Sequence, residues 1–144
     1  MMNDEQTAVA VQNFMIEHDQ LARFLGIELV EVRPGFCQTR LPLAPHLVNG
    51  LGLPHGAAIF ALADVAFAGA CNSSGQAALA LSMDIHFLTA ARLNATLTAN
   101  AQEVHQGGRT ALCHIKVTDD EGVLIAELHG MAYRKRERFL TVNS

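Results

Sequence analysis

The sequence predicts a single α+β domain, in which one antiparallel sheet carries its helices on one face. The 144 residues, half of them hydrophobic and 17% charged, suit one globular domain that spans residues 1–144. A long apolar segment of helical composition occupies about residues 55–72. After it the hydrophobic period changes to two, over three or four strand candidates with short turns between them.

The N-terminal part is expected to form an amphipathic helix over about residues 5–25. Its apolar positions follow the helical period, and Gly26 suits a C-cap. Two short strands are predicted next, in "IELVEV" and "FCQTRLPL", because the turn signal "RPG" joins them. The segment "APHLVNGLGLP", with two prolines and two glycines, is expected to be a loop.

The central segment "HGAAIFALADVAFAGAC" begins at His55 and ends at Cys71. Alanine, leucine and phenylalanine dominate it and β-branched residues are few, so a helix is favoured over a strand. "CNSSG" closes it. A helix that is apolar nearly all round must be covered by the sheet or by another subunit.

Strand candidates fill the C-terminal half. The segments "LALSMDIHFLT", "NATLTANAQEVH" and "RTALCHIKVTD" alternate apolar with polar or mixed positions, and "VLIAELHGMAYR" is the last strand. Short connections between them predict antiparallel pairing and one solvated face. The tail "RKRERFLTVNS" is basic and then irregular, and it is expected to be exposed.

Composition excludes several classes of protein. A net charge of -4 and a pI near 5.9 argue against a nucleic-acid partner. Asp64 interrupts the longest apolar run, which argues against a membrane span, and "MMNDEQTAVA" lacks the basic start of a signal peptide. The three cysteines form no CxxC motif, so we expect buried thiols in a reducing cytoplasm.

Cofactor motifs are also missing from the sequence. The seven histidines form no HxxxH or HxH pair, so no metal site is expected. The chain contains no G-x-S-x-G nucleophile elbow and no G-x-G-x-x-G dinucleotide motif. The chemistry must therefore come from other side chains.

Asp64 is the first candidate, because a carboxylate in an apolar helix is costly unless something uses or satisfies it. It lies mid-helix, where it cannot cap the N-terminus, and no Lys or Arg shares the segment. One interpretation is a carboxylate satisfied by a neighbouring hydroxyl or amide. The other is a carboxylate with a raised pKa, which suits a general base or a nucleophile.

His55 and Gly56 at the helix start are the second candidates. Nine residues separate His55 from Asp64, which is about 900° of rotation and about 13 Å of rise. The two cannot form a dyad within one copy, so a shared site would need two subunits of a twofold dimer. Gly56 lies in the first turn, where free N–H groups can stabilise an oxyanion.

The helix region resembles the phenylacetate-degradation (PaaI-like) branch of the hotdog-fold acyl-CoA thioesterases. The strand segment "MDIHFLTAA" and the hairpin "HQGGRT" fit the same family. The matching positions are Asn49-Gly50, His55-Gly56, Leu62-Ala63-Asp64, Ala66-Phe67 and Cys71-Asn72-Ser73.

The resemblance implies a hotdog fold, a homodimer with a continuous sheet and often a homotetramer. It implies hydrolysis of an acyl-CoA thioester, with Asp64 as general base or nucleophile. The oxyanion amide would be that of Gly56 in the other subunit. His55 would orient the loop, and Asn49 would position water or the thioester carbonyl. No cofactor is implied, since coenzyme A is part of the substrate.

The acyl group stays open between aromatic and medium-chain groups, which would lie in an apolar pocket near Phe60, Phe67 and Phe87. Two departures from the family pattern bear on the site, one at the oxyanion amide and one beside Asp64. Ala57 replaces a second glycine beside the oxyanion site, and Ala68 replaces a residue that is polar in some relatives.

The phosphates of coenzyme A need cationic partners, for which Arg109 and Arg134 are the candidates. Two other functions remain open on the sequence. His55 and Asp64 could serve a hydratase or dehydratase of enoyl thioesters, and Ala57 supports a module that binds acyl-CoA without turnover.

Overall fold

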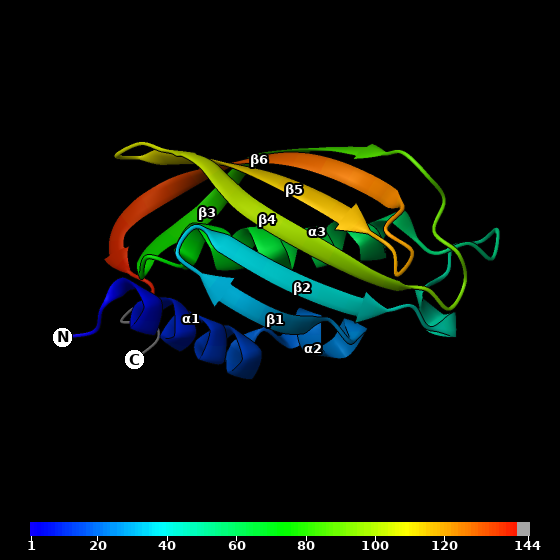
Figure 1. The fold of residues 1–144 in the computed structure, drawn as a ribbon, viewed down its shortest axis with the longest axis horizontal. Coiled ribbons are helices and arrows are strands. Elements are labelled where there is room, and N and C mark those ends of the chain that lie inside the picture. Colours follow the sequence, from blue (N-terminus) through cyan, green and yellow to red (C-terminus); the bar gives the residue numbers. More distant parts are fainter. Residues whose placement is uncertain (141–144) are drawn as a thin grey trace.

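The computed structural model describes residues 1–140 and shows helices packed on one curved sheet (Figure 1). The helices are α1 (Asp4–His18), α2 (Gln20–Leu25) and α3 (Gly56–Asn72), with a 3-10 turn at Pro45–Leu47. The strands are β1 (Glu28–Arg33), β2 (Phe36–Pro42), β3 (Gln76–Phe87), β4 (Thr96–Gln106), β5 (Thr110–Thr118) and β6 (Leu124–Arg138).

All six strands form one antiparallel sheet in the order β1-β2-β4-β5-β6-β3, which curves around α3 (Figure 1). The α+β class is therefore confirmed, and β4, β5 and β6 pair through short turns as expected. Strand β3 does not pair with β4, the next strand in the sequence, but with β6, from Gln76↔Arg138 to Phe87↔Ala126. Its link to β4 crosses to another part of the sheet instead of forming a hairpin.

The N-terminal helix predicted over residues 5–25 is wrong as a single element, because the chain breaks at Asp19. Asp19 is extended (φ -79°, ψ 94°), and its side chain accepts the Ala22 N–H at 3.0 Å, which starts α2. Gly26, at φ 86°, ends α2 in the left-handed conformation, as predicted.

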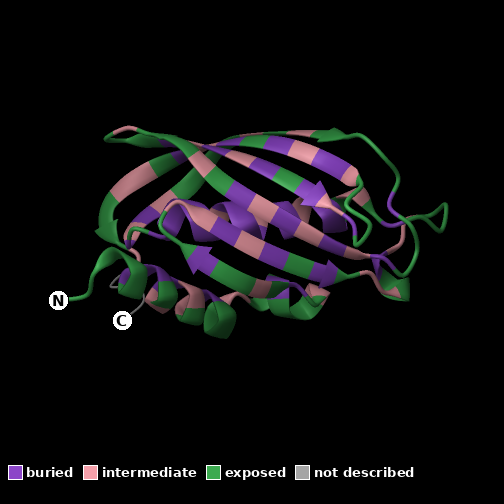
Figure 2. Cartoon of the chain, in the orientation of Figure 1, coloured by how far each residue is buried: buried purple, intermediate pink, exposed green. Residues whose placement is uncertain are grey.

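The predicted central helix is confirmed as α3, which lies in the hollow of the sheet. Figure 2 shows buried positions alternating with less buried ones along β4 and β5, as expected for strands with one face toward a core. Gly69 permits the closest approach, since a Cβ there would lie 2.4 Å from the Cys37 Sγ. All three cysteines are buried free thiols, and burial raises the pKa of Cys37 to about 12.

Strand β3 differs from its neighbours because it lies at the end of the strand order. Three of its apolar side chains are more than half exposed: Leu79 at 59%, Leu81 at 59% and Phe87 at 55%. Exposed apolar side chains on an edge strand are a pairing surface for another strand.

The last strand, predicted to end at Arg134, takes in the basic part of the tail and ends at Arg138. Beyond it, Phe139 packs edge-on against Phe14 of α1, with ring centroids 5.3 Å apart. The last four residues of the tail, 141–144, lie outside the described part. Within residues 1–140, no helix combines the length and the apolar character that crossing a bilayer needs.

Candidate active site

The start of α3 is organised by His55. The His55 Nδ1 accepts the Ala57 N–H at 2.9 Å, and the His55 backbone N–H donates to the Leu47 carbonyl at 2.8 Å. A ring nitrogen that accepts carries no proton, so the neutral ring holds its hydrogen on Nε2 and can donate it. Within residues 1–140 the Gly56 N–H has no acceptor, and it remains a free donor at the helix N-terminus.

Phe87 lies against this helix start. A Cβ built on Gly56 would lie 3.2 Å from the Phe87 Cζ, so the two are in contact although they belong to α3 and β3. The structure thus brings His55, Gly56, Ala57 and Phe87 together, as one group of the predicted site residues.

Asn49 stiffens the loop that leads into α3. Its Oδ1 accepts the N–H of Leu51 at 2.9 Å and that of Leu53 at 3.1 Å. Its backbone N–H donates to the Leu53 carbonyl at 2.7 Å. The side-chain oxygen is therefore engaged with the loop itself, and its position relative to a substrate stays a prediction.

Asp64 lies half-buried on the stripe of α3 that the sheet does not cover, with Ala57, Phe60, Ala61 and Ala68. Within residues 1–140, its carboxylate has neither a hydrogen bond nor an ion pair. The interpretation of a carboxylate satisfied by a neighbouring hydroxyl or amide is therefore not supported. Burial raises the pKa of Asp64, and the negative charge of Asp19 raises it further.

The two candidate groups of one chain lie too far apart to share a substrate carbonyl. Gly56 and Asp64 are eight residues apart in one helix, which is about 12 Å along its axis. A carbonyl in contact with both groups therefore needs the helix start of a second copy.

The remaining predicted contacts are spread over α3. Phe60 and Ala68 are half-buried on the same stripe as Asp64. Phe67 is only 3% exposed, and its ring fills the space over Gly130 of β6, so it packs the core. A substrate would have to displace this packing to touch Phe67, and that role stays a prediction.

Arg109 and Arg134 lie together at the β4–β5 hairpin. The Arg134 Nη1 donates to the Gly107 carbonyl at 2.8 Å, and its backbone N–H donates to the Arg109 carbonyl at 2.7 Å. Ala78, which pairs with Arg134, also accepts from and donates to Asn72 at the end of α3. The two arginines thus lie near the opposite end of α3 from Gly56.

An apolar groove of about 330 Å³ lies between α2 and the first half of α3. The sequence did not predict it, because the break at Asp19 that sets the direction of α2 was missed. Its lining consists of Leu21, Leu25, His46, Leu47, Val48, His55, Ala57, Ala58 and Ala61.

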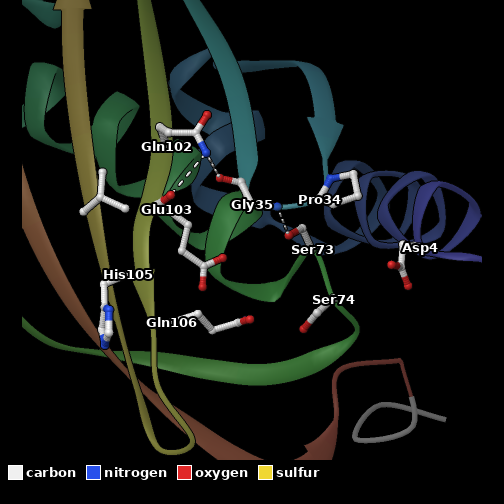
Figure 3. A pocket seen from close by; sticks show the side chains of 10 residues that line it. Asp4, Pro34, Gly35, Ser73, Ser74, Gln102, Glu103, His105 and Gln106 are labelled. Atoms are coloured by element: carbon white, nitrogen blue, oxygen red, sulfur yellow. Dashed lines mark hydrogen bonds between the residues drawn. The ribbon is translucent and has the colours of Figure 1, made fainter.

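A polar cavity of about 420 Å³ lies at the far end of α3, where Figure 3 shows Glu103 pointing into it. The Glu103 Oε1 is buried without a hydrogen-bond partner in the described part, and burial raises the pKa of Glu103. Asp4 also lines this cavity, so its charge opposes a phosphate group. None of the predicted site residues lines it.

Comparisons with known proteins show which family this chain belongs to. The family model described as "Thioesterase superfamily" matches residues 51–126. The acyl-coenzyme A thioesterase PaaI of Escherichia coli is 38% identical over 120 residues, which are 83% of this chain and 86% of that protein. A solved structure of the E. coli PaaI protein has a TM-score of 0.91 and 34% identity, and the match covers 94% of this chain and 99% of that one.

Two further relatives agree. A putative esterase of Archaeoglobus fulgidus is 34% identical over 134 residues, which are 93% of this chain and 87% of that protein. A structure of a hypothetical thioesterase protein with coenzyme A from Streptococcus pneumoniae has a TM-score of 0.74 and 25% identity, covering 78% of this chain and 90% of that one. The chain therefore belongs to the thioesterase superfamily, and within it to the PaaI-like proteins with the hotdog fold.

Proposed function

We propose that this thioester hydrolase cleaves acyl-CoA in a site that two copies of the chain build together. One observation carries the proposal: within residues 1–140, Asp64 of α3 has a carboxylate without a partner and Gly56 has a free N–H, about 12 Å apart on one helix. Two antiparallel copies of α3 would bring the start of each helix to the middle of the other.

The chemistry follows from these two groups. Asp64, as general base, takes a proton from water while the water oxygen attacks the thioester carbonyl. The partner subunit's Gly56 N–H stabilises the oxyanion that forms. When this intermediate collapses, the C–S bond breaks, and the thiolate of coenzyme A takes the proton back from Asp64. Asp64 could instead attack the carbonyl directly, so that the C–S bond breaks and the thiolate of coenzyme A leaves. Water would then hydrolyse the resulting anhydride, which frees the acid, restores the Asp64 carboxylate and supplies the proton that the thiolate takes up.

The exposed apolar side chains of β3 support a homodimer as the smallest active unit. An edge strand that carries Leu79 and Leu81 on its surface is suited to pair with a second copy, which would continue the sheet. We also propose that two such dimers associate into a homotetramer. The three free thiols are consistent with a reducing cytoplasm as the location.

The relatives support acyl-CoA as the substrate class. The E. coli relative is an acyl-coenzyme A thioesterase, and the S. pneumoniae structure contains coenzyme A. We propose that Arg109 and Arg134 hold phosphates of the substrate, because guanidinium groups pair well with phosphate. The reaction needs no cofactor of its own.

A pair of substitutions at Gly56 tests the oxyanion role. Gly56→Pro removes the N–H at the first helical position, where proline is tolerated, and His55 (φ -73°, ψ 134°) already has the conformation that precedes proline. Gly56→Ala keeps the N–H and makes the same contact with Phe87. We expect kcat for thiol release to fall about 100- to 1000-fold in Gly56→Pro and much less in Gly56→Ala.

Equal losses in the two variants would assign the effect to the contact with Phe87 and contradict the oxyanion role. Thiol release by the wild type also separates the other functions that the sequence left open. A hydratase or dehydratase would change the absorbance of an enoyl thioester without freeing coenzyme A, and a binding module would do neither.

A further inference from the structure

The helix pair α1–α2 follows the uncovered stripe of α3 in the opposite direction. Asp19, between the two helices, is close enough to Asp64 for its charge to raise the pKa of Asp64. Further along, Leu21 and Leu25 of α2 face Ala57 and Ala61 across the apolar groove. The groove therefore extends along α3 from the neighbourhood of Asp64 toward the helix start.

The position of Ala61 connects this groove to the reacting centre. Ala61 lies three residues before Asp64 on the same helix face, and such neighbours have Cβ atoms about 5–6 Å apart. A thioester whose carbonyl lies at Asp64 can therefore lay its acyl chain over Ala61 and then Ala57. The short side chains of these two alanines give the groove its depth.

The lining of the groove limits the chemistry of its occupant. Seven of its nine lining residues are apolar, and the other two are His46 and His55. Within residues 1–140 of one chain, neither a carboxylate nor a Lys or Arg belongs to the lining. A charged end of an acyl group would lose its hydration there without gaining a partner. The volume of about 330 Å³ falls within the range of about 300–1,000 Å³ that small-molecule clefts occupy.

We propose that this groove binds the acyl group and that α2 selects uncharged, apolar acyl groups longer than acetyl. The inference rests on the proposed function and deepens it, because it names the substrate class and the element that chooses it. The preference arises from apolar area buried against Leu21, Leu25 and Ala61, which is worth about a factor of four per methylene in kcat/KM until the groove is full.

The test compares kcat/KM for acetyl-, butyryl-, hexanoyl-, octanoyl- and succinyl-CoA, followed by thiol release. Ala61→Leu fills the groove, and we expect octanoyl-CoA to lose about 10-fold or more while acetyl-CoA stays within about 2-fold. Leu21→Ala removes one wall, and we expect the ratio of octanoyl to acetyl rates to fall about 3- to 10-fold. Succinyl-CoA should be hydrolysed no faster than acetyl-CoA.

Phe24→Ala is the matched control, because Phe24 also lies on α2 and is 78% exposed but does not belong to the groove lining. It should leave the octanoyl to acetyl ratio unchanged. Leu21 is 60% exposed, so Leu21→Ala keeps the fold even where Ala61→Leu disturbs packing, which thermal unfolding would show.

The groove proposal would be overturned if the ratio of octanoyl to acetyl rates is unchanged in both Ala61→Leu and Leu21→Ala, or if it changes equally in Phe24→Ala. Thiol release by the wild type would still uphold the proposed function in that case. Absence of thiol release from every acyl-CoA would overturn both.

Discussion

The carboxylate of Asp64 owes its raised pKa to its surroundings rather than to a hydrogen bond. Asp64 is half-buried on the stripe of α3 that the sheet does not cover, and this burial disfavours its charged form. Asp19 adds a like charge. A base whose pKa lies nearer neutrality removes a proton from water more readily. The same burial costs stability, because the ionised group is less well solvated in the fold than in the unfolded chain.

Asp64→Asn should therefore separate activity from stability. We expect kcat to fall about 100- to 10,000-fold, since the variant loses its base or nucleophile. Because the folded pKa is raised above the ordinary value of 3.8, the wild type loses stability as pH rises from near 4 through the folded pKa. The Tm of the variant should thus match or exceed that of the wild type at pH 7, with a smaller difference at pH 4.

A Tm that falls in Asp64→Asn at pH 7 would mean that the carboxylate is stabilised in the native state. Retained thiol release would remove Asp64 from the mechanism.

Substitution of Asn49 separates a role in the loop from a contact with substrate. Asn49→Ala removes the acceptor for the N–H groups of Leu51 and Leu53, so the start of α3 loses its support. We expect kcat/KM to fall about 100-fold, the scale of an error of about 1 Å in positioning. Asn49→Asp keeps an acceptor for both N–H groups and should retain activity within about 10-fold. If Asn49→Asp is as impaired as Asn49→Ala, the side-chain amide itself holds water or the thioester carbonyl.

At the scale of elements, the sequence predicted the helix and the strands whose patterns are set by burial, and it missed the break between α1 and α2. The apolar run made α3 evident, and alternation made β4 and β5 evident, because burial dictates both patterns. The apolar period over residues 5–25 concealed the break between α1 and α2. Asp19 ends one helix and caps the next with its side chain, and a lone Asp within a helical period did not reveal it. The groove beside α2 was missed for the same reason.

Asp19→Asn tests whether the negative charge of Asp19, at the break between α1 and α2, raises the pKa of Asp64. Asn caps a helix about as well as Asp, so the bond to the Ala22 N–H and the stability should persist. Loss of the negative charge should lower the pKa of Asp64, which would move the acid limb of the profile of kcat against pH to lower pH. Asp4→Asn, at the start of α1 beside the far cavity, is the control and should leave the limb in place. A limb that does not move in Asp19→Asn would contradict the assignment of that limb to Asp64.

At the scale of the whole molecule, the sequence predicted a sheet with helices on one face but not which strands pair with one another. Strand patterns reveal which residues face the core, whereas pairing between distant segments depends on how the chain crosses the sheet. The alternation in β3 therefore predicted a strand but not its place beside β6 at the sheet edge. Leu79 and Leu81 look like core residues in the sequence, yet in the single chain they are exposed. Their burial would need a second copy, as does a complete site.

Mixed dimers test whether the site is shared between copies. In a dimer of one Asp64→Asn chain and one Gly56→Pro chain, one site combines two substitutions while the other keeps a wild-type Asp64 and a wild-type Gly56. If half of the dimers are mixed and each has one working site, co-expression of the two inactive variants should restore about a quarter of the wild-type thiol release. Differently tagged chains, purified in sequence, would isolate the mixed dimers and raise this to about half. Mixed dimers as inactive as either parent would show that Asp64 and Gly56 do not combine across the interface, because a site within one chain would carry one substitution in every copy.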